Sequence, residues 1–224
     1  MAMSYKVPDL PLFDGSRFSQ ETLHEQAVRF EEEIKRSRFI TTLARADSRE
    51  CALSFVEAVR GEFPDARHHC WAYAVGKPGD TARVGQSDDG EPHGTAGRPM
   101  LAQLLYGGVG EVVAVTTRYF GGIKLGTGGL TRAYQNGVKQ ALNLLPVTEK
   151  QTLVRAIAEV DYAHVDRFYR LLPRFQARVS EEDFGNKGLF TLELPASSLQ
   201  ACRTALREAT DGATELISTE EENA

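Results

Sequence analysis

Residues 112–146 read VVAVTTRYFGGIKLGTGGLTRAYQNGVKQALNLLP, and they contain a strand signal followed by a helix signal. The run 112–120 is β-branched and aromatic, and its first half is apolar on both faces, which predicts a central strand deep in a sheet. After a loop at 121–129, apolar residues recur on one stripe until Pro146 stops the pattern, which predicts an amphipathic helix. The stretch therefore predicts a strand and a helix joined by a glycine-rich loop.

The residues before this stretch add further elements of a mixed α/β domain. Their apolar periods switch between the spacing of strands and that of helices. The expected elements are two strands within 28–46, a helix ending at Gly61, a strand at 68–75, a further strand at 81–86 and a helix opened by Pro99. Residues 1–24 contain proline and glycine without a sustained period, so we expect an extension that lies on the surface or is frayed.

The residues after Pro146 form a second set of signals. A strand, a helix, two strands around the turn 185–188, a helix and a last strand follow one another, and this βαββαβ order predicts a ferredoxin-like domain. The polar stretch 147–152 predicts a linker. The expected division is an N-terminal extension at 1–24, a first domain at 25–146, the linker, a second domain at 153–219 and an acidic tail at 220–224.

Composition and charge restrict the possible partners. The chain has 224 residues, of which 42% are apolar and 25% charged, as in soluble globular proteins that bury a core. The net charge is −5, so no overall positive field holds nucleic acid. Residues 25–146 carry 15 basic and 14 acidic groups, whereas residues 147–224 carry 9 and 14. Any contact with a polyanion is therefore expected to be local and on the first domain.

Cysteine usage and hydropathy indicate the compartment. The three cysteines are far apart and form no CxxC, which argues against a disulfide framework and against a cysteine-built zinc site. No segment approaches the roughly 18 to 20 apolar residues that span a bilayer, and no signal peptide is evident at the N-terminus. We expect a cytoplasmic protein without a membrane partner.

Two loops hold the unusual composition, SDDGEPHGTAGRP at 87–99 and RYFGGIKLGTGGLTR at 118–132. Each leads into a helix N-terminus, where unpaired N–H groups and the helix dipole favour an exposed anion by about 0.3–1 kcal/mol. Glycine lets a backbone approach a ligand closely, and arginine or lysine adds charge-assisted hydrogen bonds. Together the loops predict one surface for phosphate or carboxylate groups. The candidate anion- or partner-binding residues are Asp88, Asp89, Glu91, Gly94, Thr95, Arg98, Arg118, Tyr119, Gly121, Gly122, Lys124, Gly126, Thr127, Gly128, Gly129 and Arg132.

Simpler interpretations of these loops stay open. The glycines of the second loop would also serve a tight strand-to-helix connection, and Thr127 would cap the following helix. The loop is not a Walker A motif, because Thr127 follows Gly126 where a lysine is required. It is not GxGxxG either, because Thr131 stands in place of the third glycine. Binding of ATP or a dinucleotide is therefore not supported.

The acidic residues of the first loop have two interpretations. Asp88, Asp89 and Glu91 offer the oxygen ligands that a hard cation such as magnesium prefers. The commoner arrangement is an Asx-type turn in which backbone amides or nearby arginines hold the carboxylates. Strand alternation separates His69 from His68 and Cys70, which argues against a shared metal. We therefore assign no metal and no cofactor.

Nucleophilic catalysis has weak support. A serine or threonine nucleophile with a histidine base would have to combine Ser87 or Thr95 with His68 or His93. No nucleophile elbow marks such a pair. We assign no catalytic residue.

Four ordered blocks resemble a known family. They are KRSRFI at 35–40, DARHHCWA at 65–72, DDGEPHGTAGRP at 88–99, and TRYFGG at 117–122 with LGTGGLTRAY at 125–134. The sequence resembles the Impact family and its two-domain bacterial branch. The resemblance implies a ribosomal-protein-like two-layer α/β domain, also seen in elongation factor G, followed by a ferredoxin-like domain similar to that factor's C-terminal domain.

The resemblance also bears on function. Eukaryotic members of the family bind a large ribosome-associated activator and so restrain an amino-acid-starvation kinase. We therefore expect a non-enzymatic binding protein associated with translation or its stress regulation, with RNA, the ribosome or a translation-linked protein as partner at the two loops. The alternative is an enzyme or binding protein for a small phosphorylated metabolite in the same groove. The oligomeric state is not assigned.

Overall fold

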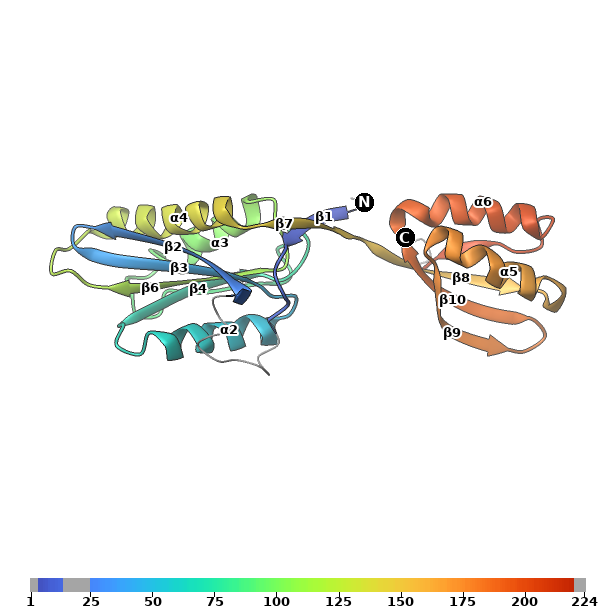
Figure 1. Cartoon of the computed structure of the whole chain (residues 1–224), viewed down its shortest axis with the longest axis horizontal. Helices are drawn as coiled ribbons and strands as arrows, with labels where there is room; N and C mark the ends of the chain where they lie inside the picture. The colour runs from blue at the N-terminus through green and yellow to red at the C-terminus, as the bar shows by residue number, and fades with distance from the viewer. Residues whose placement is uncertain (1–3, 14–24, 220–224) are drawn as a thin grey trace. The chain divides into compact units, whose positions relative to one another are not determined.

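The computed structural model describes residues 4–13 and 25–219, and the chain divides into two compact units (Figure 1). The first unit is Tyr5–Lys150, and the described part of the second consists of Ser4 and residues 151–219. The acidic tail expected at 220–224 and residues 1–3 and 14–24 of the expected extension lie outside the described residues. Within the described ranges, no helix combines the length and the apolar character needed to cross a membrane.

The first unit is built on a five-stranded antiparallel sheet with the order β2-β3-β6-β4-β5. Two further strands, β1 and β7, form a separate ribbon. The elements are β1 (Ser4–Pro8), β2 (Ala27–Ile34), β3 (Ser37–Arg45), α2 (Arg49–Glu62), β4 (His68–Ala74), β5 (Val84–Ser87), α3 (Gly97–Tyr106), β6 (Val112–Tyr119), α4 (Thr127–Leu144) and β7 (Val147–Gln151).

The core of the first unit lies on both faces of this sheet. Strand β6 is central, and its side chains alternate between the faces: Val112 and Ala114 join the core under α3 and α4, whereas Val113 and Val115 join the core under α2. All four are fully buried, which confirms the prediction of a deep central strand. Figure 1 shows α3 and α4 on one face and α2 on the other. The expected α/β class is confirmed, but α2 adds a layer that the expected two-layer description lacked.

The termini of the first unit differ from the prediction. Residues 147–151, expected as a linker, form β7 and pair with β1, which lies within the expected extension. The side chains of β7 are mostly exposed, so its sequence shows no apolar alternation. Phe13 is only 2% exposed and packs edge-on against Phe55 of α2, with 5.2 Å between ring centroids. Part of the predicted surface extension therefore packs into the core through Phe13, and the burial of this ring stabilises that position.

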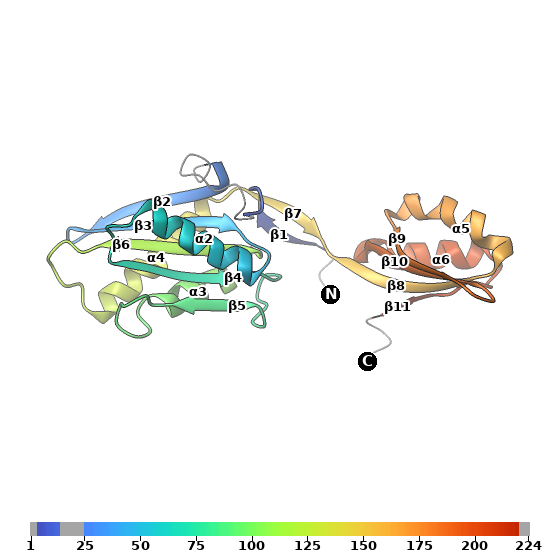
Figure 2. The same cartoon turned by 90° about the horizontal axis from the view of Figure 1, so that it is seen from below.

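The second unit has the predicted βαββαβ order, and its sheet order β11-β8-β10-β9 is that of a ferredoxin-like fold. Helices α5 and α6 cover one face (Figure 2). Along β8, Val154, Ala156, Ala158 and Val160 are buried and alternate with more exposed residues, as in a sheet with one solvated face. The elements are β8 (Leu153–Val160), α5 (Val165–Leu171), β9 (Arg178–Phe184), β10 (Gly188–Pro195), α6 (Leu199–Ala209) and β11 (Leu216–Ser218).

Candidate functional site

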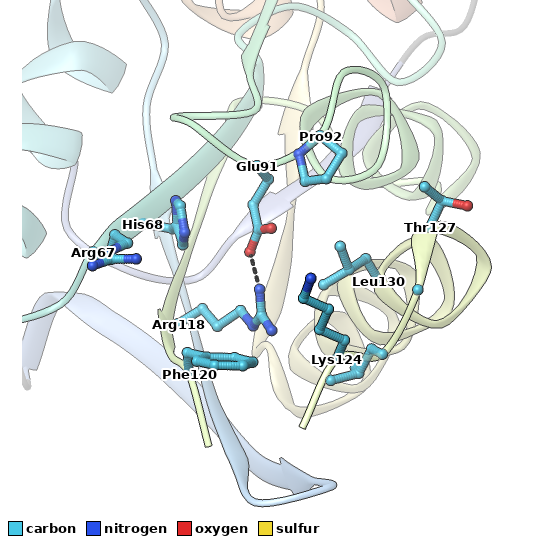
Figure 3. A pocket seen from close by; sticks show the side chains of 11 residues that line it. Arg67, His68, Glu91, Pro92, Arg118, Phe120, Lys124, Thr127 and Leu130 are labelled. Atoms are coloured by element: carbon cyan, nitrogen blue, oxygen red, sulfur yellow. Dashed lines mark hydrogen bonds and ion pairs between the residues drawn. The ribbon is translucent and has the colours of Figure 1, made fainter. Parts of the chain in front are cut away.

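The two unusual loops meet at one cavity of the first unit, with a volume of about 410 Å³ (Figure 3). We call it the first cavity. Glu91 and Pro92 reach it from the loop before α3, and residues from Arg118 to Leu130 reach it from β6 and the start of α4. It is lined by Arg67, His68, Glu91, Pro92, Arg118, Phe120, Lys124, Leu125, Gly126, Thr127 and Leu130.

The N-terminus of α4 opens onto this cavity. Helix α4 begins at Thr127, and the residue before it, Gly126, has φ 75° and provides no side chain to cap the helix. The predicted capping by Thr127 is therefore wrong, because Thr127 is the first helical residue and makes no capping hydrogen bond. Gly126, Thr127 and Leu130, at the start of the helix, line the first cavity, so the positive end of the helix dipole lies beside it.

The N-terminus of α3 is occupied by the protein itself. Asp88 accepts hydrogen bonds from the backbone N–H groups of Gly94 at 2.7 Å, Ala96 at 3.0 Å and Gly97 at 2.9 Å. Burial alone would raise the pKa of Asp88, but these three donors outweigh it and lower that pKa. Our expectation that both loops present a free helix N-terminus to an anion is therefore wrong for α3.

The other acidic residues of the first loop are also held by protein groups. Asp89 accepts a hydrogen bond from the backbone N–H of His69 at 2.7 Å and pairs with Arg60 at 3.2 Å. Asp88, Asp89 and Glu91 thus have separate partners. In the part of the chain that the structure describes, no group of three or more His, Cys, Asp or Glu side chains is placed to hold a metal ion.

Glu91 and Arg118 form a buried ion pair on the wall of the first cavity. Arg118 Nη1 donates to Glu91 Oε1 at 2.6 Å, and the Tyr134 hydroxyl donates to the same oxygen at 2.9 Å. The Arg118 side chain is 6% exposed, and its guanidinium lies 5.4 Å and 5.5 Å from the ring centroids of Phe39 and Phe120. Arg118 Nε has no hydrogen-bond partner among the described residues. The pair joins the first loop to β6, and the Tyr134 hydroxyl extends the contact to α4.

A thiol extends this network into the core. Cys70 Sγ lies 3.3 Å from the Tyr134 hydroxyl and 3.0 Å from the carbonyl oxygen of Asp88. Burial is the main cause that raises the pKa values of Cys70 and of Tyr134 well above their usual ranges. Both groups therefore stay protonated at neutral pH and act as hydrogen-bond donors.

Two exposed cations and an exposed ring surround the opening. Arg67 and Lys124 line the first cavity and form no ion pair with any described residue. Phe120 is 52% exposed although it is aromatic. Arg67 was not predicted as a site residue. The pairing of His68 with Arg118 places Arg67 beside the end of β6. The sequence signal that could have identified Arg67 is its position just before β4.

A basic turn packs against the second loop. The last pair of residues between strands β2 and β3 is Ile34 with Ser37. Lys35 and Arg36 alone therefore form the turn between the strands, with φ values of 48° and 66°. Two positive φ values are typical of a type I′ turn, which favours Asn-Gly, and each such non-glycine residue costs about 1–3 kcal/mol. A Cβ on Gly121 would overlap the carbonyl oxygen of Arg36, so only glycine allows the loop to lie this close.

A second cavity, of about 380 Å³, lies next to the first, and the two share Leu125. It is lined by Ile34, Lys35, Leu125, Gly129, Arg132, Ala133 and Asn136. Arg132 Nε donates to the carbonyl oxygen of Gly128 at 3.2 Å, which holds its guanidinium over the first turns of α4. The remaining predicted site residues line neither cavity: Gly94, Thr95, Arg98, Tyr119, Gly121, Gly122 and Gly128.

Comparisons with known proteins identify the family. The model of the Impact N-terminal domain matches residues 35–142, and the model of a domain of unknown function (DUF1949) matches residues 158–213. IMPACT family member YigZ of Escherichia coli (strain K12) is 46% identical over 190 residues, which cover 85% of this chain and 93% of that protein. The chain belongs to the Impact family. The resemblance drawn from the four sequence blocks is confirmed.

Other Impact relatives cover both units as well. An IMPACT family member of Haemophilus influenzae is 43% identical over 84% of this chain and 91% of its own length. IMPACT family member YvyE of Bacillus subtilis (strain 168) is 33% identical over 82% of this chain and 83% of its own length. A solved structure described as "Crystal structure of an hypothetical protein" is 41% identical, with a TM-score of 0.74, and covers 99% of this chain and 100% of that chain.

Proposed function

We propose that this Impact-family protein is a non-enzymatic RNA-binding protein associated with translation. In this proposal the first cavity holds a phosphate group of RNA, and a neighbouring base lies against Phe120. One observation carries the proposal: Arg67, Arg118 and Lys124 meet the uncapped N-terminus of α4 at a single cavity.

The charges at the cavity suit a phosphate. Among its lining residues, Arg118 neutralises the carboxylate of Glu91, which leaves Arg67 and Lys124 without a counter-ion in the described ranges. Free backbone N–H groups at a helix N-terminus bind phosphate oxygens, and the dipole adds to the attraction. Lysine and arginine heads at the opening add charge-assisted hydrogen bonds.

The exposed ring favours RNA over an acidic protein segment. Phe120 is half exposed at the edge of the first cavity, and Figure 3 shows the Arg118 guanidinium beside its ring. Single-stranded nucleic acids bind by stacking bases on aromatic side chains while cations track the phosphates. A carboxylate partner would use the cations but would leave this ring exposed to water.

The side chains around the cavity favour binding over catalysis. Thr95 Oγ1 donates to the carbonyl oxygen of Pro92 at 2.6 Å, and Ser87 Oγ accepts from the Asp89 backbone N–H at 3.1 Å. In residues 4–13 and 25–219, the hydrogen bond between a histidine ring and a hydroxyl side chain is that of His69 with Thr117, and both are buried. His68 and Thr127 both line the cavity, but no hydrogen bond between described residues joins them, so no hydroxyl there is paired with a histidine base.

Salt-dependent binding tests the proposal. We expect labelled single-stranded RNA to bind, with an affinity that falls steeply with salt, because each phosphate contact contributes about −0.7 to the log–log slope. Lys124→Glu should weaken binding about tenfold or more, whereas Lys139→Glu, the same charge change on an exposed residue of α4, should not. Equal RNA affinity of the wild type and Lys124→Glu would contradict the proposal.

The size of the cavity favours one alternative, a small phosphorylated metabolite. Its volume of about 410 Å³ falls within the range of about 300–1,000 Å³ that is usual for small-molecule sites. A ligand with one phosphate would show a shallow salt dependence and would compete with RNA for the site. Tight binding of a sugar phosphate or a mononucleotide, with no further gain for RNA, would favour this alternative.

A further inference from the structure

We propose that the Lys35–Arg36 turn and Arg132 form a second phosphate subsite, so that the ligand is a single-stranded polynucleotide crossing the N-terminus of α4. This inference rests on the proposed function and names the class of ligand. The first cavity takes one phosphate, and the second cavity takes a neighbouring phosphate of the same strand.

The two cavities flank the start of α4. The first cavity is lined by Gly126, Thr127 and Leu130, and the second by Gly129, Arg132 and other residues on another side of the same turns. Leu125, just before the helix, lines both. A strand that enters the first cavity therefore continues into the second by passing over the helix N-terminus.

The second cavity carries its own positive charges. Lys35 and Arg132 line it, and the structure gives neither an ion pair in the described part of the chain. Asn136 Nδ2 donates to both oxygens of Glu32, at 3.2 Å and 3.0 Å, and Glu32 does not line the cavity. The side chains that line the cavity are therefore cationic or neutral.

The turn itself points to a ligand. Lys35 and Arg36 hold positive φ angles that Asn-Gly would adopt with less strain, and both side chains are exposed. Strained backbone is found most often at functional sites. A pair of cations kept in such a turn is explained by binding of negative charge.

The position of the turn is fixed relative to the first cavity. Ser37 Oγ accepts a hydrogen bond from the backbone N–H of Gly121 at 3.1 Å, and the Arg36 backbone packs against Gly121. Gly121 lies in the loop that carries Phe120 and Lys124 into the first cavity. The two subsites are therefore held by one rigid contact, as two phosphates of one strand require.

The test compares ligands of different length, and it uses a variant of the Lys35–Arg36 turn that should have less backbone strain. We would measure binding of uridine 5′-monophosphate and of oligouridylates of two to eight nucleotides by fluorescence anisotropy or calorimetry. The variant Lys35→Asn with Arg36→Gly keeps the turn type and removes both charges, and thermal melting should show it at least as stable as the wild type. Arg132→Gln removes the third charge, and Lys139→Gln on the same helix is the control.

We expect the wild type to bind oligouridylates more tightly than the monophosphate. The turn variant and Arg132→Gln should each lose about threefold to tenfold of oligouridylate affinity, with a salt slope reduced by up to about one per lost contact, and keep the affinity for the monophosphate. Lys139→Gln should match the wild type.

Two results would overturn the inference, and they differ. If the turn variant and Arg132→Gln bind oligouridylates like the wild type, the second subsite is wrong while the proposed function stands. If the wild type binds neither the monophosphate nor oligouridylates, the proposed function itself is wrong.

Discussion

Helices α3 and α4 both begin after a glycine-containing loop, yet their N-termini are in opposite states. At α3 the carboxylate of Asp88, nine residues before Gly97, accepts the N–H groups of the first turn. At α4 the preceding residue is Gly126, and no side chain of a described residue caps the helix. One N-terminus is satisfied by the protein, and the other faces a cavity lined by cations.

The difference shows that a loop composition alone does not identify an anion site. The two loops look alike because both are rich in glycine and carry arginine. A helix N-terminus is available to a ligand when no carboxylate of the same chain fills it. The α3 N-terminus is therefore filled by a carboxylate of the protein itself, whereas Gly126 leaves the α4 N-terminus without a side-chain cap from the preceding residue.

The contact that holds the two loops together should give the largest effect on stability. Glu91→Ala would leave the Arg118 guanidinium buried without its partner, so we expect the free energy of unfolding to fall by about 3–5 kcal/mol. Urea denaturation measures this free energy of unfolding. Glu91→Leu combined with Arg118→Met removes both charges and should recover most of this loss. If Glu91→Ala were as stable as the wild type, the ion pair would not be the contact that joins the loops.

Removing the group that fills the α3 N-terminus should have the next largest effect. Asp88→Ala leaves three backbone N–H groups without their acceptor, so we expect a loss of about 2 kcal/mol in urea denaturation. RNA binding at α4 should persist at temperatures where the variant is folded. A variant without RNA binding would show that the two N-termini act together.

The pH dependence of the free energy of unfolding tests the role of the Asp88 carboxylate without removing its side chain. The pKa of Asp88 lies below its usual value of 3.8, so its stabilisation is complete above that value and is lost as pH falls through the folded-state pKa. The stability difference between the wild type and Asp88→Asn should therefore shrink below about pH 4, as measured by urea denaturation. Other carboxylates with a lowered pKa, such as Glu111, contribute to both proteins and cancel. A constant difference down to about pH 2.5 would contradict the role of Asp88.

Filling the α4 N-terminus should change stability least and binding most. A Cβ added to Gly128 would meet no other atom within 4 Å, so a side chain fits there. Gly128→Asp places a carboxylate in the first turn and should stabilise the protein by about 1 kcal/mol while it abolishes RNA binding. The matched Gly128→Ala should gain similar stability in thermal melting and keep RNA binding. Loss of binding in both variants would indicate that the backbone, not the dipole and charge, is needed there.

The helices and strands with a regular apolar period were predictable because the spacing of apolar residues along the chain indicates which face is buried. The central strand β6 and helix α4 show it most clearly, since β6 is apolar on both faces in its first half and α4 carries an apolar stripe. The βαββαβ order of the second unit followed from the same signals. The β1–β7 ribbon was missed because the side chains of β7 are mostly exposed, and a strand exposed on both faces has no alternation to detect.

The candidate site was predictable only in part. Glu91, Arg118, Lys124, Gly126, Thr127, Gly129 and Arg132 were expected and do line the two cavities. Arg67 and Lys35 were not expected, because they come from distant segments that reach the site through strand pairing. Asp88 was expected to contact a ligand but binds the α3 N-terminus, since its acceptors and the donors of that turn meet only after the loop folds back.

The amino-acid sequence alone determined the family, the α/β class and the positions of the two glycine-rich loops, because these depend on residue identity and on spacing along the chain. Only the tertiary structure decided which helix N-terminus is open and which cations stand beside it. Whether an amide or a charge is already satisfied depends on groups brought together from distant segments, and local spacing carries no record of those distances.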